Sequence, residues 1–498
     1  MNTKQLRQKI LDLAIRGKLV PQDPNDEPAS ELLERIKVEK ERLTQEGKIK
    51  RSKKEVPLTN YDKRHYGKFE IPESWVWASL GNICEPQETK KPTGEAFRYI
   101  DIDSIDNKRH CVTEPKNIPT ASAPSRAAKG LRFGDILFSM VRPYLENIAY
   151  IPQCLEDCIA STGFYVCRAH INAIFPMYFY YSLISNYAIQ GVSSHMRGDN
   201  SPAIRKNEMD NFLIPIPPLA EQHRIVTAIE SAFAVIDEIE QNKADLQSAV
   251  TAAKSKILSL AISGKLVPQD PNDEPANVLL ERIKSEREKL TKSDKIKRGK
   301  ADSATVKDCD TLHYGKLPQG WAWSTLGELA FYKKGPFGSS ITKAMFVTES
   351  ESAVKVYEQK NAIYKNHELG TYYISTEKFS ELKGFEVFSN DIIVSCAGTI
   401  GETYVMPASM RRGIINQALM RVMLYDYALT DFYLIYFDFI LKNSAQKDSK
   451  GTAIKNIPPF DILKQYEIPL PPLAEQKRIA AAIESIFSQL DNIVAIFK

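Results

Sequence analysis

A single long helix, predicted for residues 219–263, constrains this chain more than any other feature. Apolar side chains recur along it at alternating steps of four and three, the heptad pattern of a helix packed against another helix. They are Ile225, Ile229, Ala232, Ile236, Ile239, Leu246, Val250, Ala253, Ile257 and Leu260, and only Lys243 interrupts the series. Pro217 and Pro218 precede the helix, and Gly264 offers a left-handed cap. At 1.5 Å per residue the helix is roughly 68 Å long.

The partner of this helix is split between the two ends of the chain. Residues 471–498 repeat the first half of the helix, and residues 4–19 repeat its second half. The chain is therefore a two-fold repeat opened within a helix. We predict that the two copies pack antiparallel, with both termini near the midpoint of the central helix.

Composition sets wide bounds. The chain has 498 residues, 43% of them apolar and 26% charged, and we find neither an apolar run of membrane length nor a signal-peptide start. We expect a cytoplasmic protein without a membrane partner. Seven cysteines without regular spacing favour free thiols over a metal site at Cys154, Cys158 and Cys167, because no matching His/Cys pair follows. A net charge of +4 does not by itself demand nucleic acid.

Two polar loops are identical. Residues 17–29 match residues 264–276 letter for letter, and LLERIK follows in both copies. The loops are predicted to form turns. Residues 31–43 and their copy are predicted to form charged helices, in which Leu32, Leu33 and Ile36 face inward. Identical loops indicate either one docking surface presented twice or a recent duplication; we favour docking.

The duplicated segments carry two unlike bodies, residues 79–213 and 325–466. Basic linkers (residues 47–54 and 295–300) precede two pairs of tryptophans, each pair separated by one residue. We predict that these tryptophans lie on strands and pack in the core, and that they do not stack on DNA bases. These tryptophans are Trp75, Trp77, Trp321 and Trp323. Each body ends in a Pro-rich segment, IPIPPLAEQ or IPLPPLAEQ. The predicted segments are 1–44 (N-terminal repeat), 45–218 (first globular domain), 219–291 (central helix and repeat), 292–472 (second globular domain) and 473–498 (C-terminal half-helix).

The sequence resembles the specificity subunit of type I restriction–modification enzymes over essentially the whole chain. The resemblance rests on the doubled PPLAEQ-x-R-I start of the long helix, the doubled GKLVPQDPNDEPA-x-x-LLERIK, and the two W-x-W-x-x-L-G openings. It implies a mixed α/β fold: two globular target-recognition domains separated by a long antiparallel two-helix coiled-coil spacer, with pseudo-two-fold symmetry.

The resemblance also implies a function and partners. Each recognition domain would read half of a bipartite double-stranded DNA site, and the helices would set the gap and dock two methyltransferase subunits. Translocase/endonuclease subunits would join through that complex. Adenine-N6 methylation and ATP-dependent cleavage, with S-adenosylmethionine, ATP and Mg, would belong to those partners, so we expect no cofactor in this chain.

In the first body we predict DNA contacts from polar loops that contain Gly, Ser and Pro. Arg142, beside Pro143 at a strand end, carries a fork-shaped donor suited to guanine or phosphate. A surface salt bridge is the commoner role of any single arginine, but the clustering of these residues favours DNA. The predicted residues are Arg126, Ser139, Arg142, Asn147, Ser161, Thr162, Arg197, Asn200, Ser201 and Arg205.

In the second body, the segment FYKKGPFGSSI combines lysines with glycines that let backbone amides approach phosphates. A hairpin turn with solvated lysines is the alternative. Residues 447–457 parallel residues 195–206, because both precede a Pro-rich segment. The predicted DNA-binding residues are Lys333, Lys334, Ser339, Ser340, Lys447, Lys450, Thr452 and Lys455.

An enzyme would need a site, and none stands out. No G-x-x-x-x-G-K-[ST] loop is present, and NIPPF (residues 456–460) departs from the Asn/Asp-Pro-Pro-Tyr/Phe step of amino-methyltransferases. We therefore predict no catalytic residues and no metal. The alternative to a DNA-specificity subunit is a coiled-coil protein scaffold without sequence-specific DNA binding, which explains the helix but not the two unlike bodies.

Overall fold

The computed structural model describes residues 2–47, 69–170, 173–198, 200–293, 316–397, 399–448, 457 and 459–496, without the side chains of residues 441–448. The predicted basic linkers therefore lie outside the described residues, apart from Gly47. The chain divides into two compact units, Met1–Lys243 (unit 1) and Ala244–Lys498 (unit 2). The boundary falls inside the continuous helix α8, Leu219–Ile262.

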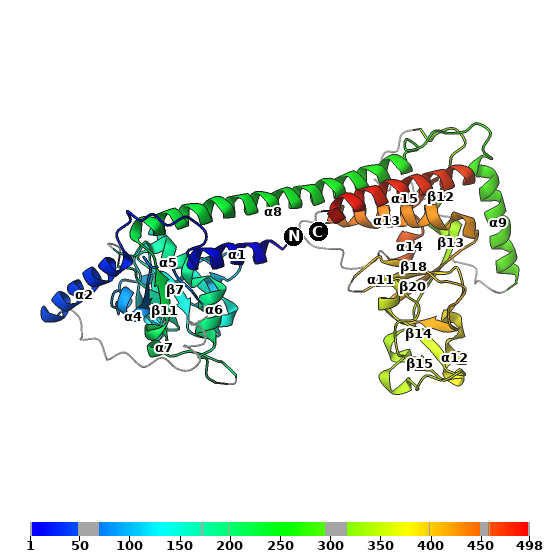
Figure 1. Cartoon of the computed structure of the whole chain (residues 1–498). Coiled ribbons are helices and arrows are strands. Elements are labelled where there is room, and N and C mark those ends of the chain that lie inside the picture. The colour runs from blue at the N-terminus through cyan, green and yellow to red at the C-terminus, as the bar shows by residue number, and fades with distance from the viewer. Residues whose placement is uncertain are drawn as a thin grey trace. The chain divides into compact units, whose positions relative to one another are not determined.

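In unit 1, helix α1 (Thr3–Ile15) lies antiparallel along the first half of α8 (Figure 1). Near the start of α1, the Nη2 atom of Arg7 donates to Asp237 at 2.6 Å and to Glu240 at 3.2 Å. Beyond the end of α1, the Nε2 atom of Gln22 donates to Glu221 at 3.1 Å, close to the start of α8. The two helices therefore run in opposite directions.

In unit 2, helix α15 (Leu473–Ile496) lies antiparallel along the second half of α8 (Figure 1). The Nζ atom of Lys254 donates to Asp491 at 2.7 Å, while Arg478, near the start of α15, bonds Asp273 beyond the end of α8 at 2.6 Å. Antiparallel packing of the split partner is thus confirmed within each unit. The seam is not buried throughout, since Ile239 is 39% exposed.

Helix α15 corrects one prediction. By length and composition alone it is apolar enough to cross a membrane, although we expected no apolar run of that length. Its buried side chains Ile479 and Ile483 belong to the core of unit 2, and it forms the ion pairs of Arg478 and Asp491 there. The first half of its apolar face therefore packs against unit 2, whereas Ile493 and Ile496 near its end are 42% and 79% exposed.

Helix α8 ends in a paired hydrogen-bond cap. The N–H of Gly264 donates to the carbonyl of Ala261 at 3.2 Å, and that of Lys265 to the carbonyl of Leu260 at 2.8 Å. These two bonds satisfy carbonyls that a helix end otherwise leaves unpaired. Gly264 has the predicted left-handed backbone, with φ +68°, and a Cβ there would lie 2.3 Å from Cγ of Pro318. Conformation and space both require glycine.

The identical loops are tied to buried glutamates at the starts of α8 and α15. In unit 1, Glu221 accepts from the Nε1 atom of Trp75 at 3.0 Å and from Gln22 at 3.1 Å. In unit 2, Glu475 accepts from Trp321 at 2.9 Å and from Gln269 at 3.1 Å. We call each such set of one glutamate, one tryptophan and one glutamine a glutamate cluster.

Each glutamate cluster gives the loops an intramolecular reason to be identical. A buried carboxylate is costly unless it is hydrogen-bonded, and Gln22 and Gln269 supply such bonds. Burial raises the pKa of Glu221 and Glu475, and the glutamine and tryptophan hydrogen bonds lower it again in part.

The tryptophan assignment is only partly correct. Trp75 and Trp321 are buried as predicted, and Trp77 packs against the core of unit 1. Trp323, however, is 42% exposed. Alternate residues of a strand face opposite sides, and in unit 2 the second side is open.

Short charged helices follow each glutamate cluster. They are α2 (Ala29–Gln45) and α9 (Ala276–Lys292). Leu32 and Ile36 are buried in α2, and Leu279 and Ile283 are buried in α9. The predicted inward faces are confirmed for these residues, whereas Leu33 is only partly buried. We call α1, α2, α8, α9 and α15 the frame.

The body of unit 1 opens with β1 (Val76–Ser79), which pairs with β11 (Leu213–Ile216) of the Pro-rich segment. One sheet has the order β5 (Lys116–Pro119), β2 (Ala96–Ile100), β9 (Ile159–Ser161), β6 (Ala127–Gly130). A second has the order β10 (Phe164–Cys167), β7 (Ile136–Ser139), β8 (Ile148–Tyr150), and β3 (Ile105–Asp106) pairs with β4 (Cys111–Val112). Helices α4 (Leu80–Ile83), α5 (Pro176–Leu183), α6 (Asn186–Ser193) and α7 (Lys206–Asn211) complete it.

The body of unit 2 opens in the same way, with β12 (Ala322–Thr325) paired to β21 (Glu467–Leu470). Its sheets have the orders β13 (Ala330–Lys334), β20 (Leu419–Leu424), β17 (Ile392–Ser395), β18 (Thr403–Val405) and β15 (Tyr373–Ile374), β14 (Val354–Tyr357), β19 (Gly413–Ile415), β16 (Glu386–Val387). Helices α10 (Leu326–Leu329), α11 (Gln359–Ile363), α12 (Thr376–Leu382), α13 (Thr430–Asp448) and α14 (Phe460–Leu463) complete it. The mixed α/β class is confirmed.

Each body buries an aspartate–arginine pair between two paired strands. Asp135, before β7, accepts from Nε and Nη2 of Arg168, which follows β10, at 2.8 and 2.7 Å. In unit 2, Asp391 stands before β17 and Arg421 lies on the paired strand β20, with Oδ2 and Nε 3.6 Å apart. Burial raises the pKa of Asp391 to about 6 against the opposing charge of Arg421. The two bodies thus share an internal arrangement that is not apparent from their sequences.

Gly264→Ala should destabilise unit 2 by about 2–5 kcal/mol. The left-handed backbone should contribute about 1–2 kcal/mol of strain, and overpacking against Pro318 should contribute about 1–3 kcal/mol. Gly320→Ala is the matched control, because its φ is +84° but the nearest contact of an added Cβ, Pro472, is 3.4 Å away. Gly320→Ala should lower the free energy of unfolding only by the backbone strain. Urea unfolding of both variants measures the difference, and equal losses would show that the contact with Pro318 costs nothing.

The raised pKa of Asp391 also predicts a pH dependence. Between about pH 4 and pH 6 the folded chain keeps a proton that the unfolded chain has lost, so the free energy of unfolding falls as pH rises through this window. Asp391→Asn should remove up to about 3 kcal/mol of that fall. Urea unfolding at several pH values tests this, with the exposed Asp461→Asn as control. A variant with the wild-type slope would contradict it.

Candidate nucleic-acid interface

Two loops of unit 1 that were predicted to face DNA lie side by side. Val141 and Ala203 form an isolated β-bridge. The N–H of Arg142 donates to the carbonyl of Pro202 at 2.8 Å, and its Nη2 atom donates to the carbonyl of Asn200 at 2.8 Å. Residues 141–147 and the described residues of the second loop, 197–198 and 200–205, therefore form one surface.

The loop between β7 and β8 is strained. Arg142 and Glu146 have φ of +47° and +59°, a left-handed region that side chains other than glycine rarely adopt. Asn107 holds the loop by donating to the carbonyl of Leu145 at 2.8 Å, and His110 Nδ1 lies 3.2 Å from the carbonyl of Glu146. Burial lowers the pKa of His110, and the charge of Glu146 opposes this. Such strain is common at functional sites.

A hollow of about 460 Å³ opens between this loop and residues 102–107. It is lined by Ile102, Asp103, Ile105, Asn107, Val141, Arg142, Leu145, Asn147 and Ser201. Three of these, Arg142, Asn147 and Ser201, were predicted from sequence. Asp103 and Asn107 were missed, because they come from a segment far away in the sequence and carry no pattern of their own.

Two predicted serines are buried and hold turns. Ser139 Oγ donates to the carbonyl of Val141 at 2.8 Å, and Ser161 Oγ accepts from the N–H of Gly163 at 3.2 Å. Arg126 and Thr162 are exposed and adjacent, since the N–H of Thr162 donates to the carbonyl of Arg126 at 2.8 Å.

Two of the arginines predicted to contact DNA bind the same glutamate, Glu208. Arg197 forms an ion pair with Glu208 at 3.0 Å, and its side chain is 66% exposed. The backbone N–H of Arg205 donates to Glu208 at 2.8 Å, at the start of α7. The surface salt bridge that we weighed against DNA contact is thus present at Arg197.

In unit 2 the segment after β13 presents charged and aromatic groups. Lys333 lies over the ring of Phe385, 4.7 Å from its centroid, and Lys334 is exposed. A Cβ on Gly335 would lie 1.8 Å from the carbonyl oxygen of Asn416, so the close backbone approach requires glycine. Phe337 is 87% exposed. Sequence reasoning missed Phe337, because an aromatic residue in a loop reads as a buried anchor.

Two predicted serines follow Phe337. Ser339 is exposed, Ser340 is partly buried, and both belong to a 3-10 turn, Gly338–Ser340. The remaining predicted residues of unit 2 are not described. Lys447 lies in the part of α13 whose side chains are not placed, and Lys450, Thr452 and Lys455 lie outside the described residues. They stay predictions.

The two bodies have chemically different side chains at one structurally equivalent position. The N–H of Ser139 donates to the carbonyl of Asn147 at 3.0 Å, and the N–H of Ser395 donates to that of Glu402 at 2.9 Å. Asn147 and Glu402 therefore occupy the same place opposite strands β7 and β17. An amide stands in unit 1 and a carboxylate in unit 2, where Lys365 lies 3.6 Å from Glu402.

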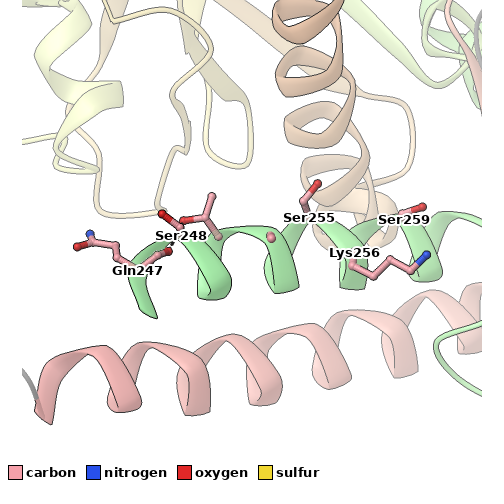
Figure 2. A pocket seen from close by; sticks show the side chains of 7 residues that line it. Gln247, Ser248, Ser255, Lys256 and Ser259 are labelled. Atoms are coloured by element: carbon pink, nitrogen blue, oxygen red, sulfur yellow. Dashed lines mark hydrogen bonds between the residues drawn. The ribbon is translucent and has the colours of Figure 1, made fainter. Parts of the chain in front are cut away.

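A second hollow, of about 690 Å³, follows one side of α8 in unit 2. Its lining is Gln247, Ser248, Thr251, Ala252, Ser255, Lys256 and Ser259, and Figure 2 shows the labelled side chains along that single helix. Lys256 is the one charged residue of this lining. The stripe offers neither a basic cluster for DNA nor paired groups for acid–base chemistry.

Comparison with known proteins agrees with this arrangement. The family model described as the type I restriction modification DNA specificity domain matches twice, over residues 72–247 and 318–496. The chain is 27% identical to the type I restriction enzyme EcoEI specificity subunit of Escherichia coli, covering 98% of this chain and 90% of the relative. It is 28% identical to the EcoAI specificity subunit of the same organism, over 99% and 90%.

Solved structures show the same likeness. A chain from a structure concerned with complex assembly and conformational transition of the type I R-M system aligns with a TM-score of 0.62 and 26% identity, over 86% of this chain and 94% of that chain. The HsdS subunit from Thermoanaerobacter tengcongensis aligns with a TM-score of 0.50 and 26% identity, over 87% and 93%. This chain therefore belongs to the family of type I restriction–modification DNA specificity subunits.

Proposed function

We propose that each body reads one half of a bipartite double-stranded DNA site and that helix α8, with α1 and α15, sets the gap between the halves. The observation that carries this proposal is the contrast between a frame whose loops, residues 17–29 and 264–276, are identical and two bodies with different side chains at equivalent positions. Asn147 against Glu402 is the clearest case. An amide both donates and accepts hydrogen bonds, whereas a carboxylate only accepts, so the two sites suit different base edges.

The hollow of unit 1 supports DNA reading by its composition. It combines apolar walls with a few polar groups from separate loops, and such groups can contact base edges as well as phosphates. Lys333, Lys334 and the exposed Phe337 give unit 2 a different surface, basic and aromatic.

The frame supports docking of two copies of one methyltransferase subunit. Outside the glutamate clusters, both units present the same exposed ion pair, Glu27 with Arg35 at 2.5 Å and Glu274 with Arg282 at 2.6 Å. Two identical surfaces suit two identical partners. Translocase/endonuclease subunits would join through this complex.

In this proposal the chain itself is not catalytic. Both E. coli relatives are specificity subunits. Adenine-N6 methylation and ATP-dependent cleavage, with their S-adenosylmethionine, ATP and Mg, would reside in the partner subunits, in the cytoplasm where the DNA is. The alternative is a coiled-coil scaffold without DNA selectivity. Such a scaffold does not account for two unlike bodies on one repeated frame.

The direct test is to map methylated adenines in a genome that carries the complete modification complex. We expect two short sequences separated by a constant gap. Exchanging residues 79–213 for the body of another family member should change one half-site and leave the other and the gap intact. Modification without sequence preference would leave only the scaffold alternative.

An insertion of four residues into α8 tests the role of the helix. It would add about 6 Å and turn the following residues by about 40°. We expect the preferred gap to lengthen while both half-site sequences stay the same, because half-sites on one face of DNA recur every 34–36 Å or so. The same mapping measures this. Altered half-site sequences with an unchanged gap would refute the proposal that the helix sets the gap.

A further inference from the structure

We propose that the hollow of unit 1 recognises an adenine base through the side-chain amide of Asn147. This inference rests on the proposed function, since it names one base contact within the half-site that unit 1 reads. It assigns the specificity to a single side-chain amide and not to the exposed arginines around it.

Asn147 is a nearly buried residue whose side-chain amide is unpaired within the described part of the chain. Its relative exposure is 8%, and it lines the hollow. Among the described residues its backbone carbonyl accepts from Ser139, but its side-chain amide makes no hydrogen bond. Its amide nitrogen and oxygen are not fully enclosed, so a ligand in the hollow that supplies an acceptor and a donor can bond to both atoms.

The backbone around Asn147 is arranged to present it. Glu146, the preceding residue, has the left-handed φ of +59°, and Arg142 at the other end of the loop has φ of +47°. Hydrogen bonds from Asn107 to Leu145, and between His110 and Glu146, hold this loop in place. A strained and well-anchored loop keeps the amide in one position before the ligand arrives.

The hollow has the size and walls that suit a planar base. Its volume is about 460 Å³, and Ile102, Ile105, Val141 and Leu145 supply apolar walls. Apolar side chains on either side with polar groups at the edge are the usual features of a base-binding pocket. Asp103 also lines the hollow, and its negative charge opposes a phosphate there.

Adenine is the base that this chemistry fits best. An asparagine amide forms two bonds with adenine, accepting from the N6 amino group and donating to N7 in the major groove. The carboxylate of Asp103 can accept only, which also suits the amino group of adenine and disfavours the O6 acceptor of guanine.

Two geometries would give this contact. The adenine can remain in the duplex and show N6 and N7 in the groove, or it can leave the stack and show N6 and N1 from its pairing edge. Both use the same amide and the same amino group, and the experiment separates them.

The test compares wild type, Asn147→Ala and Glu402→Gln, each in the complete modification complex, by mapping methylated sites. Asn147→Ala should lower discrimination at one adenine of one half-site by about 10- to 100-fold, the loss of a two-bond base contact. The other half-site should keep its sequence, which also shows that the variant is folded and assembled. Glu402→Gln, at the equivalent position of unit 2, should leave the unit 1 half-site unchanged.

The second measurement uses duplexes with 7-deazaadenine at the position that Asn147 reads. Lost binding by the wild-type complex assigns the contact to N7 in the groove. Retained binding assigns it to the pairing edge of an extruded base. Unchanged discrimination in Asn147→Ala, or equal weakening at all positions, would overturn the inference. A wild-type complex without sequence preference would instead refute the proposed function itself.

Discussion

The frame depends on two buried carboxylates. Glu221 and Glu475 are 0% and 1% exposed, and each accepts hydrogen bonds from a tryptophan and a glutamine. One glutamate cluster thereby joins the start of a long helix, the loop after the antiparallel helix, and the first strand of a body. A carboxylate buried in this way tolerates no loss of a partner, because an unpaired buried charge costs several kcal/mol. This explains why both loops have a glutamine at the same place, Gln22 and Gln269, while the bodies change.

A constant frame lets the bodies vary at their surfaces. Each body begins with a strand paired to its own Pro-rich segment, and each buries one aspartate–arginine pair beside its central strands. These contacts fix the ends and the interior of the body. The loop between β7 and β8 is held largely through its backbone groups, so its side chains can differ from those of the equivalent loop. Asn147 and Glu402 show the result, because the same backbone hydrogen bond supports two different side chains.

Sequence reasoning found part of the candidate site, and its failures have clear physical causes. Polar loops near strand ends pointed to Arg142, Asn147 and Ser201, which the fold brings around one hollow. The same reasoning included Ser139 and Ser161, whose hydroxyls are used to close turns. Short polar side chains look alike in sequence whether they face a ligand or their own backbone. Asp103 and Asn107 were invisible, since only packing joins their segment to the others.

The sequence by itself determined the long helix, its split antiparallel partner, the capping glycines and the duplicated plan, because heptad periodicity and repetition are local patterns that can be read one residue at a time. It also indicated the family. Only the tertiary structure decided which polar residues meet, which of them form internal hydrogen bonds, and that the side-chain amide of Asn147 has no partner among the described residues. Those outcomes depend on contacts between segments tens of residues apart, and no local pattern records them.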